Sequence, residues 1–250
     1  MKDNNTKNDN DNTFMFVNTM IKDYTVHTLV SQDEYEIVFN GVNNVTGVDV
    51  EVCVVNKDAM NDVFMMKMLF HKGVVQLYEV VECKGKVIVV KERRPQWTLR
   101  DVNVDNEIEV FNIFAQIISV VRYMHLMGVY HLNINVDNVR VDVNKGNLIK
   151  LTKFYYSKYI NKDSNDSSSN SNVYVNEEYD VLNCASPEIH SHLPFIPSAV
   201  DVWSCGVILY YLITNTFPFG DNDSLNKDAL LNGNINYNHS ISPELKDLIS

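Results

Sequence analysis

Residues 123–138 read YMHLMGVYHLNINVDN, and this segment decides how the rest of the chain is interpreted. It begins inside a series of apolar residues at intervals of three, four, seven and eight, which are Val110, Ile113, Phe114, Ile117, Ile118, Val121, Met124 and His125. That spacing is typical of an amphipathic helix. The remainder, HLNINVDN, does not continue the period.

A second segment, residues 201–213, reads DVWSCGVILYYLI and is apolar on nearly every face. It predicts a buried helix over Val202–Ile213, with Ser198 as its N-cap and Pro218 just beyond its end. Twelve residues are too few to span a membrane, which needs about 18 or more. Between the two helices, residues 161–172 contain no apolar residue and predict a disordered insert.

The preceding half of the chain, up to about Glu92, is rich in valine and has a different pattern. Its strand-like segments are residues 36–39, 48–55, 74–81 and 86–90, and residues 59–69 are helical in pattern. The segment from Asn40 to Gly47 has the composition of a hairpin turn. This half therefore predicts a small, mainly antiparallel sheet with a single helix.

Composition limits the class of protein. Residues 1–21 predict a disordered polar tail, since residues 1–12 are almost entirely Asn, Asp, Lys and Thr. The 21 basic and 32 acidic side chains give a net charge of -11, which excludes a nucleic-acid binder held by phosphate contacts. Absence of a signal-peptide core or membrane-length apolar run predicts an intracellular, cytoplasmic protein. The four scattered cysteines favour reduced thiols over disulfides or a zinc site.

Five motifs in order resemble those of eukaryotic protein kinases. Residues 123–138 are similar to the catalytic loop, H-R-D-L-x-x-x-N; TKFY (152–155) stands in the place of D-F-G, SPE (186–188) in that of A-P-E, and residues 201–213 look like the central C-lobe helix. The segment through residues 217–219 is most similar to the AMP-activated and calmodulin-dependent groups. Over residues 22–250 the resemblance implies an α+β, bilobal fold. It has an antiparallel-sheet N-lobe (22–92) and a mainly helical C-lobe (93–250) that lacks its last helices.

The resemblance places several unsuitable residues in the N-lobe nucleotide site. Tyr35 and Val38 match the glycine-rich loop G-x-G-x-x-G-x-V, but its three glycine positions hold Ser31, Asp33 and Glu36. Two carboxylates would repel a triphosphate. The strand lysine that should contact the phosphates is Cys53, and the glutamate that pairs with this lysine falls near Asp62.

The C-lobe motifs depart from the family in the same way. Leu132 and Asn133 replace the arginine and the catalytic aspartate, and an amide does not accept a proton at neutral pH. Lys153 stands where the magnesium carboxylate should be. Asn138 is retained; it would ligate the second metal in an active relative, or it orders the loop by hydrogen bonds.

Two ion pairs are hypotheses from the same alignment. Glu51 and Arg140 replace the residues that sandwich adenine in the family, and they are expected to pair across the cleft or to face solvent. Lys153 is expected to pair with Asp62. The basic run Lys91, Arg93 and Arg94 is interpreted as solvated surface. Scaffold positions match the family at Met66, His131, Phe154, Glu188, Asp201, Trp203 and Gly206.

These replacements predict a catalytically inactive kinase-like protein, a pseudokinase, that works as a protein-binding scaffold or allosteric regulator. The expected partner is a protein, such as an active kinase, with no nucleic acid, membrane or cofactor. One alternative is an unconventional ATP- and magnesium-dependent serine/threonine kinase in which other residues supply the missing groups. A second is a decaying or truncated paralogue. The sequence identifies neither the partner nor the oligomeric state.

Overall fold

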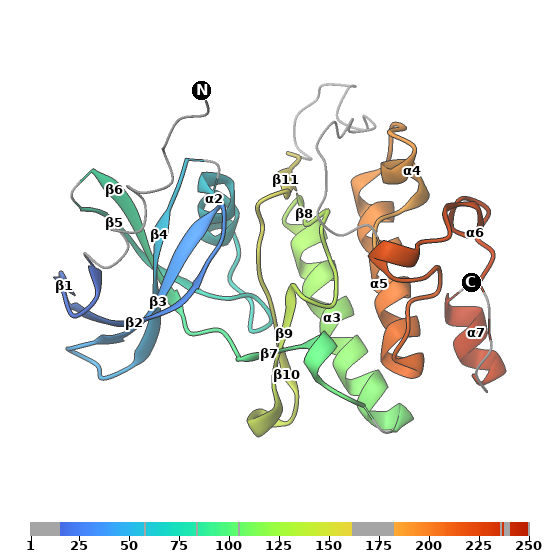
Figure 1. Cartoon of the computed structure of the whole chain (residues 1–250), viewed down its shortest axis with the longest axis horizontal. Coiled ribbons are helices and arrows are strands. Elements are labelled where there is room, and N and C mark those ends of the chain that lie inside the picture. The colour runs from blue at the N-terminus through green and yellow to red at the C-terminus, as the bar shows by residue number, and fades with distance from the viewer. Residues whose placement is uncertain are drawn as a thin grey trace, which may run out of the picture. The chain divides into compact units, whose positions relative to one another are not determined.

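The computed structural model describes residues 16–57, 59–83, 85–104, 106–161, 183–235, 237 and 241–249. The chain divides into two compact units (Figure 1). Unit 1 comprises residues 1–70 and 75–94, and unit 2 comprises residues 71–74 and 95–250. The division falls two residues later than the predicted boundary after Glu92, because Arg93 and Arg94 pair with carboxylates of unit 1.

Unit 1 is built on one six-stranded antiparallel sheet, with the strand order β1-β2-β3-β4-β6-β5. Its elements are β1 (Met20–Ile21), β2 (Tyr24–Gln32), β3 (Glu36–Asn43), β4 (Asp49–Val55), α2 (Met60–Met68), β5 (Leu77–Cys83) and β6 (Lys86–Glu92). The valine-rich, strand-like segments predicted an antiparallel sheet in this half of the chain. The structure confirms this prediction. The long strand β2 was not predicted.

The two faces of this sheet differ in chemistry because side chains alternate along each strand. One face carries Phe39, Val52 and Ile88 and belongs to a fully apolar core cluster, to which Phe16 and Ile21 also belong. Both of these residues are buried, so the prediction of a disordered tail is wrong for residues 16–21. Residues 1–15 of that predicted tail lie outside the described part of the chain.

Unit 2 is mainly helical, as predicted. Its elements are β7 (Trp97–Thr98), η2 (Leu99–Asp101), α3 (Glu107–Leu126), β8 (Val129–Tyr130), β9 (Val139–Asp142), η3 (Val143–Lys145), β10 (Leu148–Leu151), β11 (Lys158–Tyr159), α4 (Pro187–His190), α5 (Pro197–Thr214), η4 (Asn222–Ser224), α6 (Lys227–Leu231) and α7 (Pro243–Ile249). The two long helices α3 and α5 pack against each other (Figure 1). Apart from Asn161, the predicted insert 161–172 lies outside the described residues.

Helix α5 is longer than predicted and begins differently. Pro197 occupies its first turn, so Ile196 is the N-cap and the prediction of Ser198 as N-cap is wrong. The helix ends at Asn215, whose left-handed backbone (φ 52°) stops the hydrogen-bond ladder. With 18 residues, α5 is long and apolar enough to cross a membrane, but 61% of it is buried inside the protein, as is common for a core helix.

Candidate functional site

Three positions of the predicted nucleotide site, Val38, Glu51 and Cys53, lie on the second face of the unit 1 sheet. The register places Val38 of β3 opposite Cys53 of β4, and it places Glu51 of β4 opposite Lys91 of β6. Cys53 is fully buried, and burial followed by the charge of Glu36 raises the pKa of its thiol well above the ordinary value. Cys53 is therefore a neutral core residue in this environment.

A buried charge cluster, which we define as Glu36, Glu51, Lys91 and Arg94, occupies this face. The Glu36 carboxylate accepts hydrogen bonds from Lys91 Nζ at 2.8 Å and from Arg94 Nη1 at 3.3 Å. Arg94 Nε also contacts Glu51 Oε1 at 3.0 Å. The four side chains expose only 3% to 8% of their surface, so two cations and two carboxylates compensate one another away from water.

The pKa values follow from these contacts. Burial alone would raise the pKa of Glu36, but Lys91 and Arg94 outweigh it and lower this pKa to about 2. Burial opposes the charge on Lys91, whereas the charges of Glu36 and Asp62 raise its pKa far above the ordinary value. For Glu51 the effect of burial is the larger one, so its pKa is raised even though the charge of Arg94 acts to lower it. Glu36 and Lys91 are therefore charged throughout the neutral range.

These contacts correct the interpretation of the basic run as solvated surface. Lys91 and Arg94 are buried ion-pair partners, and only Arg93 faces solvent, where it contacts Asp49 at 2.8 Å. The signal was present in the sequence. Lys91 has the same strand parity as Val89, which points to the buried second face.

The turn between β2 and β3 corresponds to the glycine-rich loop and is closed by Asp33. The Oδ1 atom of Asp33 accepts hydrogen bonds from the backbone N–H groups of Tyr35 and Glu36, both at 2.9 Å. The Asp33 N–H in turn donates to the Glu36 carbonyl at 3.0 Å. Ser31 is exposed, and its hydroxyl lies 3.5 Å from Arg94 Nη2. Two backbone donors of the turn are thus already occupied by a side chain of the chain itself.

In unit 2, the segment that resembles the catalytic loop is anchored by Asp201 of α5. This fully buried carboxylate accepts the backbone N–H groups of His131 at 2.9 Å and Leu132 at 2.8 Å, and it contacts His125 Nε2 at 2.8 Å. The His131 ring accepts the N–H of Asn133 at Nδ1, so its Nε2 carries the proton and donates to the Thr152 carbonyl at 3.1 Å. Burial lowers the pKa of His131, which favours this neutral form.

The loop itself is held by amide side chains. Asn133 Oδ1 accepts a hydrogen bond from Asn135 Nδ2 at 3.0 Å, and Asn138 Nδ2 donates to the Asn133 carbonyl at 2.9 Å. Asn135 is fully buried and its Oδ1 accepts the N–H groups of Asp137 and Asn138. Asn135 was not predicted as a site residue, because it stands at a variable position of the motif. The Asn138 side chain acts here as a loop-ordering hydrogen-bond donor.

The remaining acidic side chain of this loop, Asp137, is also engaged. Arg100 forms a two-point contact with it, Nε to Oδ1 and Nη2 to Oδ2, both at 2.8 Å. Lys153 has a left-handed backbone (φ 64°), and the following residue, Phe154, is fully buried with its ring centroid 4.8 Å from that of His131. The packing partners of the D-F-G segment are therefore present, whereas its carboxylate is replaced by an ammonium group.

The two hypothetical ion pairs each join residues of different units and stay predictions. Within unit 1, the contact of Glu51 is with Arg94. Within unit 2, Arg140 Nη1 donates to the Gln96 carbonyl at 3.1 Å. Asp62 is buried on α2, and its charge is one of those that raise the pKa of Lys91.

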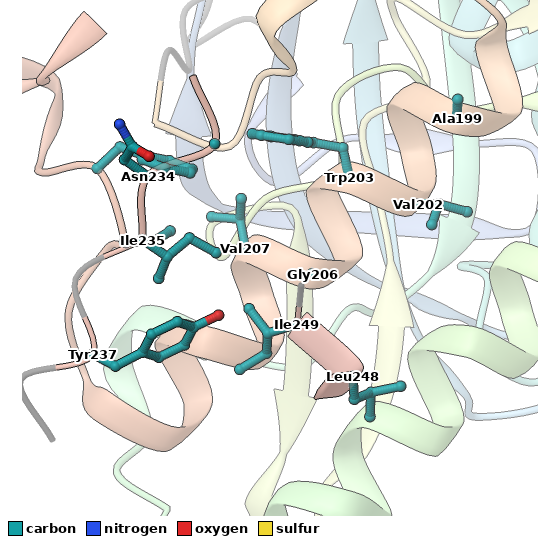
Figure 2. Close-up of a pocket in the computed structure, with 13 residues that line it drawn as sticks. Ala199, Val202, Trp203, Gly206, Val207, Asn234, Ile235, Tyr237, Leu248 and Ile249 are labelled. Carbon is teal, nitrogen blue, oxygen red and sulfur yellow. The ribbon is translucent and has the colours of Figure 1, made fainter. Parts of the chain in front are cut away.

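Unit 2 also carries an apolar groove beside α5, with a volume of about 880 Å³. Figure 2 shows Trp203, Val207, Ile235, Tyr237 and Ile249 around it. The Trp203 ring stacks on Phe219, with centroids 5.7 Å apart, and Gly206 lies in the floor of the groove. Among the described residues, no group of three or more His, Cys, Asp or Glu side chains could hold a metal ion.

Comparison with known proteins agrees with this architecture. The chain is 33% identical over 175 residues to "Probable serine/threonine-protein kinase KCC4" of Saccharomyces cerevisiae, covering 68% of this chain and 16% of that protein. It is 29% identical over 241 residues to CBL-interacting serine/threonine-protein kinase 26 of Arabidopsis thaliana (90% and 53%). It is also 29% identical over 218 residues to NUAK family SNF1-like kinase 1 of Mus musculus (81% and 31%).

The chain thus spans between about a sixth and about half of the length of these relatives. The family model described as "Protein kinase domain" matches residues 29–250, which include strands β3 to β6 of unit 1 and the anchored loop of unit 2. The chain belongs to the protein kinase domain family.

Proposed function

We propose that this protein is a catalytically inactive member of its family, a pseudokinase, that works by binding another protein. The observation that carries the proposal is the amide side chain of Asn133 in the loop that resembles the catalytic loop. Phosphoryl transfer needs a carboxylate there to accept the substrate hydroxyl proton. The structure has an amide instead, whose oxygen already accepts a hydrogen bond from Asn135.

The residues present do not fit the magnesium and ATP that the family uses. Lys153 brings a positive charge to the position of the metal-binding carboxylate, and a cation repels a cation. Asn138 donates its amide hydrogen to the Asn133 carbonyl, so it could offer a metal ion only its neutral amide oxygen, which alone is a weak ligand. Cys53 supplies no charge to a phosphate, because its thiol is buried and neutral. We therefore derive no catalytic step through these groups.

The groove of unit 2 supports a binding role for the C-terminal unit. Its lining is mainly apolar, and two residues at its edge, Val202 and Leu248, expose 61% and 56% of their surface. Exposed apolar surface of this kind is typical of sites that bind another protein. The proposed partner is a protein with an apolar contact segment, such as an active protein kinase, and the proposed location is the cytoplasm.

The alternative is an unconventional ATP-dependent serine/threonine kinase. The observation that favours it is the cation Lys91, which lies on the strand next to Cys53 and could replace the missing strand lysine. The names of the similar proteins, which describe them as kinases, are consistent with it.

Two measurements on the purified chain distinguish the alternatives. We expect no transfer of labelled phosphate from ATP to a mixture of serine and threonine peptides, and no rise in melting temperature with ATP and magnesium. The control is the Lys91→Met variant, which lacks the cation on which the alternative depends and is purified in parallel, because a contaminating kinase would label peptides equally in both preparations. Labelling by the wild-type chain that the variant lacks would overturn the proposal.

A further inference from the structure

We propose that Lys91 and Arg94 form a compact anion site on the sheet of unit 1, and that its resident anion is the chain's own Glu36 carboxylate. The inference rests on the proposed function and explains how an inactive member of the family can satisfy the charges of its nucleotide region without nucleotide. All three side chains belong to unit 1, so the site is complete within that unit.

The geometry is that of a bound oxyanion. Two cationic groups converge on one carboxylate, with Lys91 Nζ at 2.8 Å from Oε2 and Arg94 Nη1 at 3.3 Å from Oε1. The Cys53 thiol on the same face also helps to lower the pKa of Glu36, after the larger effects of Lys91 and Arg94. Each of the three charged side chains is more than nine-tenths buried. Charge-assisted donors on both oxygens of one anion are how proteins recognise carboxylate and phosphate groups.

The adjacent turn repeats the arrangement with backbone donors. Asp33 places one carboxylate oxygen 2.9 Å from the N–H groups of Tyr35 and Glu36. Successive N–H groups in a turn form a concave site for an anion. Asp33 and Glu36 both stand where the family resemblance has glycine. The Asp33 carboxylate therefore accepts two backbone N–H groups, and the Glu36 carboxylate accepts two cationic side chains. These are hydrogen-bond donors that an external oxyanion could otherwise use.

The register of the sheet explains why the Glu36 carboxylate lies at this site. Glu36 opens β3 on the same face as Val38, and the neighbouring strands place Cys53 and Lys91 on that face. Glu51 faces the same region, and its Oε1 atom contacts Arg94 Nε at 3.0 Å. The Glu36 carboxylate contacts both Lys91 and Arg94 and so joins the two cations.

The experiment removes the Glu36 carboxylate by mutation and then adds a free anion that can bind in its place. Glu36→Ala removes the carboxylate and leaves a void beside Lys91 and Arg94. We expect inorganic phosphate or acetate, at constant ionic strength against chloride, to stabilise this variant in urea unfolding. At a concentration of about ten times the Kd, the folded-to-unfolded ratio should rise about 11-fold. The wild-type chain, whose site is filled, should show no such rise.

Three matched variants separate anion binding from simple filling of a cavity. Val38→Ala opens space on the same strand and face without freeing a cation, and Glu36→Gln frees the cations without opening space, so neither should respond. In the double variant Glu36→Ala/Lys91→Met, the response should be lost. If Glu36→Ala does not fold in chloride, its refolding in phosphate or acetate is the readout.

The absence of rescue in Glu36→Ala by either anion would overturn the inference, and so would an equal response of Val38→Ala. Neither result bears on catalysis, because wild-type phosphate transfer is measured separately. Conversely, a wild-type chain that labels peptides would defeat the proposed function while the anion response of Glu36→Ala still decides the site.

Discussion

Leu132 shows how one residue can change the role of a position. It stands where the family has an arginine, and the structure buries it with Phe195 and Val200, at 2% exposure. Its backbone is left-handed (φ 62°), a conformation that costs free energy for a residue with a branched side chain. The strain is held by Asp201, which accepts the Leu132 N–H at 2.8 Å. The position has therefore become part of an apolar core.

Truncation of this side chain should destabilise the protein. Leu132→Ala removes buried methyl groups and leaves a cavity, so we expect the free energy of unfolding to fall by about 2–4 kcal/mol. Urea unfolding followed by circular dichroism measures it. The control is Leu126→Ala, at a position that is 64% exposed, where the change should stay within about 0.5 kcal/mol. Equal effects in both variants would contradict the assignment of Leu132 to the core.

The pKa of Glu36 predicts how stability depends on pH. Its ordinary value of 4.5 falls to about 2 in the folded protein, so the ionised carboxylate stabilises the fold at pH values above about 4.5. This contribution, roughly 3 kcal/mol, is lost as the pH falls from about 5 through 2, because the unfolded chain then binds the proton first.

Glu36→Gln has no such titration, so its difference in unfolding free energy from the wild type should shrink steadily between pH 5 and 2. Urea unfolding at several pH values measures the difference, and Asp49→Asn in the exposed pair with Arg93 is the control. A gap between wild type and Glu36→Gln that is independent of pH would show that the Glu36 carboxylate is not held in the ionised form.

At the scale of elements, the β2–β3 hairpin lacks the glycines of the loop that it resembles. A glycine-rich turn leaves its backbone N–H groups open, whereas here Asp33 accepts two of them and joins the turn to β3. The strands on either side are paired through Ser31 opposite Val38 and Gln32 opposite Ile37. The hairpin is therefore closed by its own side chains before any ligand is considered.

Asp33→Ala should loosen this hairpin without unfolding the sheet. Two N–H groups lose their acceptor, the one of Tyr35 in an exposed hydrogen bond and the one of Glu36 in a part-buried one, so we expect a loss of about 1–3 kcal/mol in the free energy of unfolding. Amide hydrogen exchange should accelerate at Tyr35 and Glu36 and stay unchanged in β4 and β6. Glu34→Ala, at the exposed neighbouring position, is the matched control. Unchanged exchange at Tyr35 and Glu36 would argue against the side-chain closure.

At the scale of the whole molecule, the four cysteines report on how the chain is packed. Cys53, Cys184 and Cys205 are buried, and Cys83 is partly exposed. Burial raises the pKa of Cys184 to about 12 and also raises that of the other two buried thiols. Since the thiolate is the reactive form, access and ionisation both protect these three residues.

A thiol reagent should therefore label Cys83 quickly under native conditions. The three buried cysteines should react only at the rate at which local or global unfolding exposes them. Mass spectrometry after partial labelling should locate the fast site at Cys83, and Cys83→Ser should abolish the fast phase. Rapid labelling of Cys53 in the native protein would contradict its place in the core of unit 1.

Some elements of the fold could be predicted from the sequence and others could not. The strands around Val52 and Ile88 and the helix through Ile113 and Ile117 follow from local periodicity, because burial on one face repeats every 2 or 3.6 residues. The unpredicted strand β2 is largely exposed, so its sequence lacks that alternation. The burial of Phe16 depends on a sheet face formed by residues far along the chain, so the sequence around Phe16 does not reveal this contact.

Sequence alone determined which charges were exchanged, since Cys53, Asn133 and Lys153 can be read directly from motifs that lie in order along the chain. Only the tertiary structure decided what the exchanged residues contact. Glu36 meets Lys91, 55 residues away, because strand order and register place them on one buried face. Such pairing depends on long-range strand order, which local periodicity does not encode. For this reason two residues of a basic run that was expected in solvent, Lys91 and Arg94, belong instead to the buried charge cluster.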